Sequence, residues 1–388
     1  MTEYNFDEII DRTQHHSAKW TLFDADSLPM WVADMDFRSP PSAVEAMIER
    51  AKHGVFGYTM DSARLKDTIV ERMKTLYDWD ITPEDIVLSP RMVTALNAVA
   101  KGFGKDGDGV LIQSPVYGPF YSATRNNRKF TQNVDMAYVS DGATFHYEAD
   151  YDDFARAATE PQTTIHFQCN PHNPAGSMYP REELETIADI CLKNDVMIVA
   201  DEIHSDLILE GKHIPIATLS DEVAQNTLTM IAPSKTYNIP GMGCSILIAQ
   251  NKDIRETISN TLRGMGVHVN TLGFEAAYGA YTGGGEWLEQ LLAYLKANRD
   301  FAIDFIQTNM PQIKTTIPVA TYLLWMDMRA FSIEGSPAEF IKEEGKVIFN
   351  DGTFFGPAGD GFVRMNFGCP RSTLEDGLNR LKAAVDKL

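Results

Sequence analysis

The chain has 388 residues, of which 44% are hydrophobic and 23% are charged. This balance is typical of globular proteins and excludes a disordered or fibrous chain. With 34 basic and 54 acidic residues the net charge is −20, which argues against binding to nucleic-acid backbones or anionic membranes. The four cysteines form no CxxC pair, and we see neither a signal peptide nor an apolar run long enough to span a membrane. We therefore expect a soluble cytoplasmic protein.

The N-terminal half begins with about forty irregular residues that contain several prolines. A first helix is expected to start near Ser42, a candidate N-cap in front of an amphipathic run. A second helix is expected from Ser62 to Tyr77, because its apolar residues recur at helical spacing. These two helices precede the first predicted strand.

Strands and helices then alternate along the chain. Two helices are predicted over residues 93–103 and 181–194. Short apolar runs predict strands over residues 86–89, 109–114, 163–168, 196–201, 228–233 and 244–249. Such alternation indicates βαβ units and a mostly parallel sheet flanked by helices, which is an α/β fold.

The C-terminal part has a different pattern. Three consecutive glycines at 283–285 interrupt the chain, and a long helix is predicted over 286–310. Short strands are then predicted over residues 321–329, 346–349 and 362–367. We expect a large α/β domain over residues 48–282. A smaller α+β domain would combine residues 1–47 with residues 283–388.

Two motifs resemble functional sites but fit ordinary structure better. Gly102–Gly107 matches GxGxxG, yet it follows a helix and precedes a strand, the reverse of the order in a dinucleotide-binding loop. His166, Cys169 and His172 have metal-like spacing. His166 and Cys169 would point to opposite faces of an extended segment, and no second ligand pair lies nearby. We therefore predict a tight turn for the first motif and no metal site for the second.

Three polar residues mark the carboxyl ends of predicted parallel strands: Asn173, Asp201 and Lys235. Ligands of α/β sheets bind at this edge, so the three side chains should converge on one pocket. A lysine can form an imine with an aldehyde, a carboxylate can keep a pyridine nitrogen protonated, and an amide can bind a phenolic oxygen. Each residue alone has an ordinary explanation as a surface or turn residue. Together, in this order, they indicate a site for pyridoxal 5'-phosphate (PLP).

Longer motifs around these residues resemble fold-type I PLP enzymes, whose fold is of the aspartate-aminotransferase (class I and II) type. The motifs are CNPHNPAG (169–176), VADEIHSDL (199–207) and PSKTYNIPGMG (233–243). More narrowly, the chain resembles the cystathionine β-lyase, or C–S lyase, branch of the MalY and PatB type. This resemblance extends over nearly the whole chain and includes PMWVADMDF (29–37), SPVYGPFY (114–121), residues 280–300 and FVRMNFGCPR (362–371).

The resemblance implies a role for each matching residue. Lys235 would link to the cofactor and move protons at the substrate Cα, and Asp201 would pair with the ring nitrogen. Asn173 would contact the phenolic oxygen and the substrate, and Tyr117 would stack on the ring and take part in catalysis. Arg364 would bind the substrate carboxylate, because its guanidinium forks onto carboxylates. Tyr117 as an ordinary half-buried aromatic and Arg364 as an ion-pair residue remain alternatives.

The cofactor phosphate needs donors of its own. The N–H groups of Met92 and Val93 would lie at a helix N-terminus, which favours phosphate, and Ser234 could add a hydroxyl. In family members, a tyrosine at the position of Tyr58 reaches the phosphate of the neighbouring subunit and borders its substrate. The resemblance thus implies a homodimer with shared active sites. A core role for Tyr58 is the alternative.

Four positions depart from the related enzymes. Gly243 lies eight residues after Lys235, where many aminotransferases have a phosphate-binding Arg. His204 replaces a common Tyr and would line the cofactor pocket or support the ring oxygen. Arg91 stands where the phosphate loop of this branch usually begins with Gly, and Ala232 stands where Ser is common. We expect the phosphate contacts to be rearranged, with Arg91 as a possible source of positive charge.

The function implied is α,β-elimination of L-cystathionine or a related cysteine S-conjugate to a thiol, pyruvate and ammonia. With cystathionine the thiol is homocysteine, which would connect the enzyme to methionine biosynthesis. Two alternatives stay open at this point: an aminotransferase on the same scaffold, and a PLP-binding regulator that acts through protein contact. The sequence does not select one sulfur-containing substrate.

Overall fold

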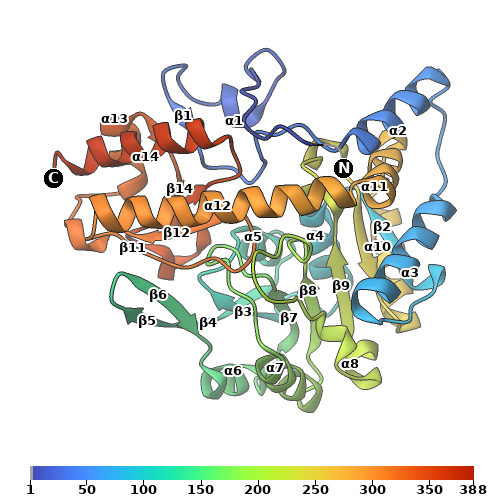
Figure 1. Cartoon of the computed structure of the whole chain (residues 1–388). Helices are drawn as coiled ribbons and strands as arrows, with labels where there is room; N and C mark the ends of the chain where they lie inside the picture. Colours follow the sequence, from blue (N-terminus) through green and yellow to red (C-terminus); the bar gives the residue numbers. More distant parts are fainter. Residues whose placement is uncertain (1–2) are drawn as a thin grey trace.

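A seven-stranded sheet forms the centre of the computed structural model, which describes residues 3–388 (Figure 1). The strand order is β2-β10-β9-β8-β7-β3-β4, and only β10 runs antiparallel to its neighbours. The mostly parallel sheet predicted from the sequence is confirmed. Its strands are β2 (Ile86–Ser89), β3 (Gly109–Ser114), β4 (Phe130–Asp135), β7 (Thr163–Cys169), β8 (Met197–Asp201), β9 (Thr227–Ile231) and β10 (Ser245–Ile248).

Helices cover both faces of this sheet, as its buried strands require. Val199 packs into the cluster on one face, whereas Ile198 and Ala200 pack into a cluster on the other. The first face is covered by α4 (Met92–Gly102), α5 (Pro119–Asn126) and α10 (Lys252–Gly264). The second is covered by α3 (Ala63–Tyr77), α6 (Tyr151–Ala158), α7 (Arg181–Lys193), α8 (Asp221–Gln225) and α11 (Thr271–Gly283).

The first two long helices show how local sequence sets a helix start. Helix α3 begins after Ser62, whose hydroxyl oxygen accepts a hydrogen bond from the Leu65 N–H at 3.3 Å. Helix α2 (Pro41–Lys52) begins two residues earlier than expected, with Pro40 as its N-cap. The prediction of Ser42 as N-cap is therefore wrong. The reason is that Pro41 fits the first helical position, where its fixed φ and missing N–H cost nothing.

A six-stranded sheet is built mainly from the C-terminal part. Its order is β14-β15-β12-β11-β6-β5. The β5–β6 hairpin comes from the chain between β4 and α6 and reaches this sheet through one parallel pairing of Thr144 with Thr315. It was not among the predicted strands, because only Phe145 is fully buried in it. The strands are β5 (Ala137–Asp141), β6 (Thr144–Glu148), β11 (Lys314–Thr315), β12 (Leu323–Asp327), β14 (Asn350–Asp351) and β15 (Phe362–Asn366).

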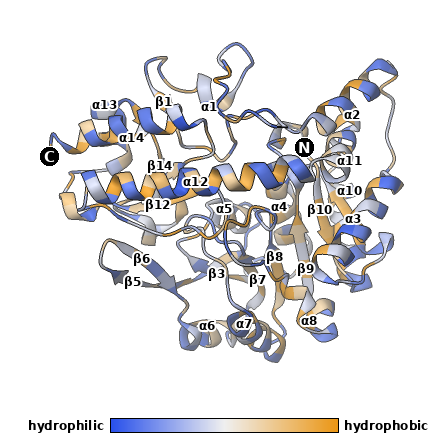
Figure 2. Ribbon diagram, viewed as in Figure 1, coloured by the Kyte–Doolittle hydropathy of each residue, from blue (hydrophilic) through white to orange (hydrophobic). Residues whose placement is uncertain are grey.

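The long helix α12 (Gly285–Asn309) crosses the molecule next to the C-terminal elements (Figure 1). As the glycine run predicted, it is separated from α11 at Gly284, where an added Cβ would come within 2.6 Å of the Tyr237 ring. Apolar and polar residues alternate along its surface (Figure 2). Its apolar side packs in the same core as α14 (Arg371–Val385) and α13 (Pro337–Gly345).

The N-terminal segment also joins the C-terminal part. After the short helix α1 (Ala18–Thr21), strand β1 (Leu28–Pro29) pairs in parallel with β13 (Val347–Ile348). The segment that follows β1 then runs toward the carboxyl ends of the central strands. Within residues 3–388, no helix combines the length and the apolar character that crossing a membrane would need.

Candidate active site

A cavity of about 360 Å³ lies at the carboxyl ends of β7, β8 and β9. The structure brings Asn173, Asp201 and Lys235 together there, although they are far apart in the sequence. Asn173 lies in the turn after β7, Asp201 is the last residue of β8, and Lys235 belongs to the short helix α9 (Pro233–Thr236) after β9. Six further predicted residues line the same cavity: Met92, Val93, Tyr117, His204, Ser234 and Arg364.

Asp201 is a buried carboxylate, and few neighbouring groups offset the free-energy cost of burying its charge. Its side chain accepts a hydrogen bond from the Ile203 N–H at 3.2 Å. Burial raises the pKa of Asp201 to about 7, against the Ile203 hydrogen bond and the positive charge of Lys235. A cationic N–H group beside the Asp201 carboxylate would offset the free-energy cost of burying its negative charge. The carboxylate thus fits a protonated ring nitrogen in the cavity.

Lys235 carries the amine of the site. Its Nζ donates a hydrogen bond to the Ala33 carbonyl oxygen at 2.6 Å. Burial lowers the pKa of Lys235 to about 8; the charges of Asp34 and Asp201 act upward, and that of Arg364 acts downward. About one-tenth of the amine is therefore uncharged at pH 7, far more than for an ordinary lysine. An uncharged amine can attack an aldehyde or accept a proton.

Arg364 extends from β15 into the cavity and is buried. Its Nη1 donates to Asn173 Oδ1 at 2.9 Å, and its Nη2 donates to the Trp31 carbonyl oxygen at 2.8 Å and to Asn350 Oδ1. Burial lowers the pKa of Arg364 to about 10, so it stays charged at neutral pH. Its Nε has no hydrogen-bond partner. This unpaired donor and positive charge suit a carboxylate ligand.

Two ring side chains complete the walls. His204 is buried, and burial together with the charges of Lys235 and Arg364 lowers its pKa to about 3, so the imidazole is neutral. Its Nδ1 lacks a partner. Tyr117 is half-buried, and its ring meets that of Phe354 edge-on with centroids 6.0 Å apart. Burial raises the pKa of Tyr117, so its phenol is protonated.

The N-terminus of α4 forms another part of the cavity wall. Arg91 is its N-cap, and the first helical residues, Met92 and Val93, line the cavity with Ser234 and Gly243. Backbone N–H groups in a first helical turn lack helical partners and attract anions. Gly243 has φ +58°, and a Cβ there would lie 2.7 Å from the Pro90 carbonyl oxygen. The Arg91 side chain is exposed and has no ion-pair partner among residues 3–388.

Tyr58 does not join the cavity of its own chain. It lies in the loop between α2 and α3 and is fully exposed, at 112% of the reference area. Val55, Phe56 and Met60 in the same loop are also exposed. The structure thus places this loop on the surface, where Tyr58 does not line the cavity of its own chain.

Several residues of the site were not predicted. Asn350, Phe354 and Tyr322 contact the cavity or its lining residues, and Phe355 lies 4.9 Å from the Arg364 guanidinium. Asn350 pairs with Arg364 across the β14–β15 ladder. A two-residue strand has no recognisable sequence signal, so this partnership follows only from the folded chain.

The GxGxxG match and the group of His166, Cys169 and His172 belong to the ordinary structure of the fold. Gly102–Gly107 connects α4 to β3 and contains two residues with positive φ, Gly104 and Gly107. A ring nitrogen of His166 bonds the Leu111 carbonyl oxygen at 3.1 Å, and the ring packs edge-on against Phe154. Over residues 3–388, no three or more His, Cys, Asp or Glu residues are grouped so as to hold a metal ion.

Comparison with known proteins agrees with this geometry. Residues 28–381 match the family model "Aminotransferase class I and II". The chain belongs to this family. It is 41% identical over 390 residues to cystathionine beta-lyase PatB of Bacillus subtilis, covering 98% of this chain and 100% of that protein. The fold is of the aspartate-aminotransferase type, since aspartate aminotransferase from Thermus thermophilus superimposes with a TM-score of 0.82 at 22% identity and 92% coverage of both chains.

Solved structures of higher identity cover the whole chain. Cystalysin from Treponema denticola, which contains a pyridoxal 5'-phosphate cofactor, has a TM-score of 0.94 at 34% identity and covers 100% of both chains. The PLP-bound C–S lyase from Staphylococcus hominis, complexed with L-cycloserine, has a TM-score of 0.91 at 31% identity and covers 99% of both chains.

Proposed function

We propose that this protein is a PLP-dependent C–S β-lyase that cleaves L-cystathionine or related cysteine S-conjugates. One arrangement carries the proposal: a lysine of lowered pKa, a buried carboxylate of raised pKa and a buried arginine with an unpaired donor border one cavity. The similarity to cystathionine beta-lyase PatB and to a PLP-bound C–S lyase supports the choice of reaction.

The cofactor is pyridoxal 5'-phosphate, and the cavity residues suit its parts. Asp201 would bind the protonated ring nitrogen, which would offset the free-energy cost of burying its carboxylate. Asn173 would bind the phenolic oxygen, and Tyr117 would stack on the ring. When bound, the cofactor supplies an aldehyde for linkage to amines and an electron-poor ring that stabilises negative charge at Cα.

The N-terminus of α4 would hold the phosphate, with the N–H groups of Met92 and Val93 and the hydroxyl of Ser234 as its donors. Arg91, which has no ion-pair partner among the described residues, neutralises part of its charge. Gly243 allows the chain to pass close to the start of α4, because any larger residue would strike the Pro90 carbonyl.

The protein groups then act on the substrate in turn. Arg364 binds the α-carboxylate and thereby orients the Cα–H bond. The uncharged Lys235 amine takes the proton from Cα. The electron pair left on Cα forms a double bond to Cβ while the C–S bond breaks, and the sulfur leaves as a thiolate with the bonding pair. Water converts the remaining three-carbon fragment into pyruvate and ammonia.

Pyruvate release from L-cystathionine tests the proposal. We expect multiple turnovers by PLP-loaded protein in the absence of any 2-oxo acid, with homocysteine formed in equal amount. The Lys235→Ala variant should form none. If PLP-loaded protein releases no pyruvate and instead requires a 2-oxo acid, it is an aminotransferase, and the lyase assignment is wrong.

We also infer a homodimer in which Tyr58 reaches the phosphate and substrate of the partner subunit. The exposure of Tyr58 with Val55, Phe56 and Met60 supports this inference, because clustered apolar residues on a surface mark interaction sites. Mixing two inactive variants, Tyr58→Ala and Lys235→Ala, and letting their subunits exchange should restore activity, since one site in the hybrid is intact. Failure of exchanged hybrids to gain activity would reject shared sites.

The domain limits and the cell compartment follow the same reasoning. We infer that residues 48–282 form the cofactor-binding domain, because they contain the seven-stranded sheet. Residues 1–47 and 283–388 form the smaller domain, to whose sheet the β5–β6 hairpin is added.

The four cysteines are free and buried, which supports a reducing compartment such as the cytoplasm.

A further inference from the structure

The N-terminal segment contributes a wall to the site, as the resemblance to the C–S lyase branch implies for residues 31–37. Residues 32–36, here called the strap, border the 360 Å³ cavity through Val32 and Ala33. They also border a neighbouring cavity of about 960 Å³, which shares Val32, Ala33 and Lys235 with the first. The strap therefore lies directly against the catalytic amine.

The Ala33 carbonyl oxygen is the contact between strap and lysine. It accepts a hydrogen bond from Lys235 Nζ at 2.6 Å and a second one from the Tyr322 hydroxyl at 2.9 Å. A carbonyl oxygen has two lone pairs, and here both are used. The orientation of the amine thus depends on where the strap holds this carbonyl.

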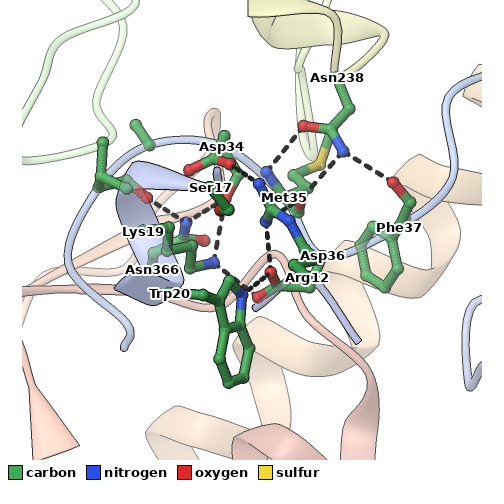
Figure 3. A network of polar contacts seen from close by, with 12 residues as sticks. Arg12, Ser17, Lys19, Trp20, Asp34, Met35, Asp36, Phe37, Asn238 and Asn366 are labelled. Atoms are coloured by element: carbon green, nitrogen blue, oxygen red, sulfur yellow. Dashed lines mark hydrogen bonds and ion pairs between the residues drawn. The ribbon is translucent and has the colours of Figure 1, made fainter. Parts of the chain in front are cut away.

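Asparagine side chains fix the strap backbone on both sides of Ala33. Asn366 Nδ2 donates to the Val32 and Asp34 carbonyl oxygens at 2.7 and 2.8 Å. Asn238 Oδ1 accepts from the Met35 N–H, and its Nδ2 donates back to the Met35 carbonyl, both at 2.9 Å. The strap is consequently held by side chains from the middle and from the C-terminal part of the chain (Figure 3).

The two acids of the strap differ in their surroundings. Asp36 is buried and accepts from Lys19 Nζ and an Arg12 Nη, both at 2.6 Å, and from Trp20 Nε1 at 2.8 Å (Figure 3). Among residues 3–388, Arg12 is the one ion-pair partner of the Asp34 carboxylate. The carboxylate of Asp36 is thus saturated by its own network. That of Asp34 has capacity left for another cation.

Lys19 and Lys235 are further cations near Asp34. Lys19 Nζ donates to the Asp34 carbonyl oxygen at 3.1 Å, and Asp34 and Lys235 both line the 960 Å³ cavity. The charges that act on the Lys235 amine come from Asp34 and Asp201, which favour its ammonium form, and from Arg364, which disfavours it. Asp34 has the largest effect of the three. The neighbouring His204 and Tyr322 are uncharged at neutral pH, because burial lowers the pKa of His204 to about 3 and raises that of Tyr322 well above its usual value.

We propose that Asp34 is a positioning residue for Lys235. The strap binds the amine through the Ala33 carbonyl whenever Lys235 is not linked to the cofactor, and Asp34 stabilises the ammonium that forms when the lysine takes the Cα proton. Arg12 limits this effect by neutralising part of the Asp34 charge. The inference rests on the proposed function, in which Lys235 is the proton acceptor.

Two single variants should move the Lys235 pKa in opposite directions. Asp34→Asn removes the anion and should lower the pKa by about one unit. Arg12→Gln leaves the Asp34 charge unopposed and should raise it, while Arg12→Lys should restore the wild-type value. A strap with only a structural role would respond to loss of either partner in the same direction.

The measurement uses cofactor-free protein, so that it does not depend on turnover. The rate at which each variant captures PLP is followed over pH by the absorbance of the lysine–aldehyde linkage, and its midpoint reports the Lys235 amine. The ionisations of free PLP are the same for all variants and cancel in the comparison. Glu8→Gln is the matched control, because Glu8 lines the 960 Å³ cavity but pairs with exposed Arg38.

The outcomes separate the two proposals. Midpoints that shift down for Asp34→Asn and up for Arg12→Gln, with Glu8→Gln unchanged, support the inference. Shifts of the same sign, or no shift beyond that of Glu8→Gln, overturn it while leaving the proposed function intact. If wild-type protein forms no linkage with PLP at any pH, the proposed function itself fails.

Discussion

The two sides of Lys235 differ in how well their polar groups are satisfied. On the side of the strand ends, Asp201 has a single backbone hydrogen bond, and His204 Nδ1 and Arg364 Nε have no partner. On the strap side, Asp36 has three donors. Because an unsatisfied buried group is costly, the first side is complete only with ligands bound. The Asp36 network on the second side is satisfied within the protein alone and can act as a rigid reference.

Removal of Lys235 should give the largest effect, because it breaks the link between the two sides. We expect Lys235→Ala to lower kcat by about 10⁴-fold or more, since both the covalent linkage and the proton acceptor are lost. The PLP linkage absorbance should disappear as well. Lys193→Ala, on the exposed end of α7, should change neither quantity. Retention of wild-type turnover by the Lys235 variant would contradict the site.

Disruption of the Asp36 network on the strap side should mainly lower the free energy of unfolding. Asp36→Asn leaves the ammonium of Lys19 buried without its ion pair, so the free energy of unfolding should fall by about 3–5 kcal/mol. Denaturant unfolding measures this change. Glu8→Gln, which breaks an exposed pair with Arg38, should cost less than about 1 kcal/mol. Equal losses in the free energy of unfolding of the two variants would mean that the strap network stabilises the fold no more than an exposed ion pair does.

Removal of the buried charge of Asp201, at the strand ends, should have the opposite effect on the free energy of unfolding. In cofactor-free protein the folded-state pKa of Asp201 is about 7, above its usual 3.8. The folded state therefore binds more protons than the unfolded state between these values, and its stability falls as pH rises from about 4 through 7. Asp201→Asn should remove this fall and stabilise the cofactor-free protein at pH 8, on the order of 2–4 kcal/mol.

Thermal unfolding at pH 4 and pH 8 checks this prediction, and PLP-loaded protein provides the control. With PLP bound, Asp201→Asn should lose both the stabilisation and most of the turnover, because the ring nitrogen no longer has an anionic partner. If the cofactor-free variant is less stable than wild type at pH 8, other groups of the protein already offset the cost of burying the Asp201 carboxylate.

Conservative change of Arg364 should have the smallest effect of the four. Lysine keeps the charge but cannot fork onto a carboxylate, so Arg364→Lys should lower kcat/KM by about 100-fold. Part of the loss should come from a higher KM for L-cystathionine, measured by steady-state pyruvate release. Arg181→Lys, at the exposed start of α7, is the matched control. An unchanged KM and kcat would exclude Arg364 from carboxylate binding.

Much of the fold could be predicted because its signals are local. The strands predicted over 86–89 and 109–114 coincide with β2 and β3, and the glycine break between α11 and α12 was also predicted. Asn173, Asp201 and Lys235 were predictable as a set because each follows a buried apolar run, and the ends of parallel strands meet at one sheet edge. The start of α2 was missed by two residues, because Pro41 fits the first helical position and moves the cap from Ser42 to Pro40.

What only the tertiary structure decided are contacts between segments far apart in the chain. These include the pairing of Asn350 with Arg364, the addition of the β5–β6 hairpin to the C-terminal sheet, the exposure of Tyr58 and the contact of Ala33 with Lys235. Hydrophobic spacing and strand-end position are properties of a short stretch of sequence, so the sequence by itself determined the order of elements and the main site residues. The strap depends on hydrogen bonds from residues some 200 to 330 positions away, and no local pattern encodes such partners.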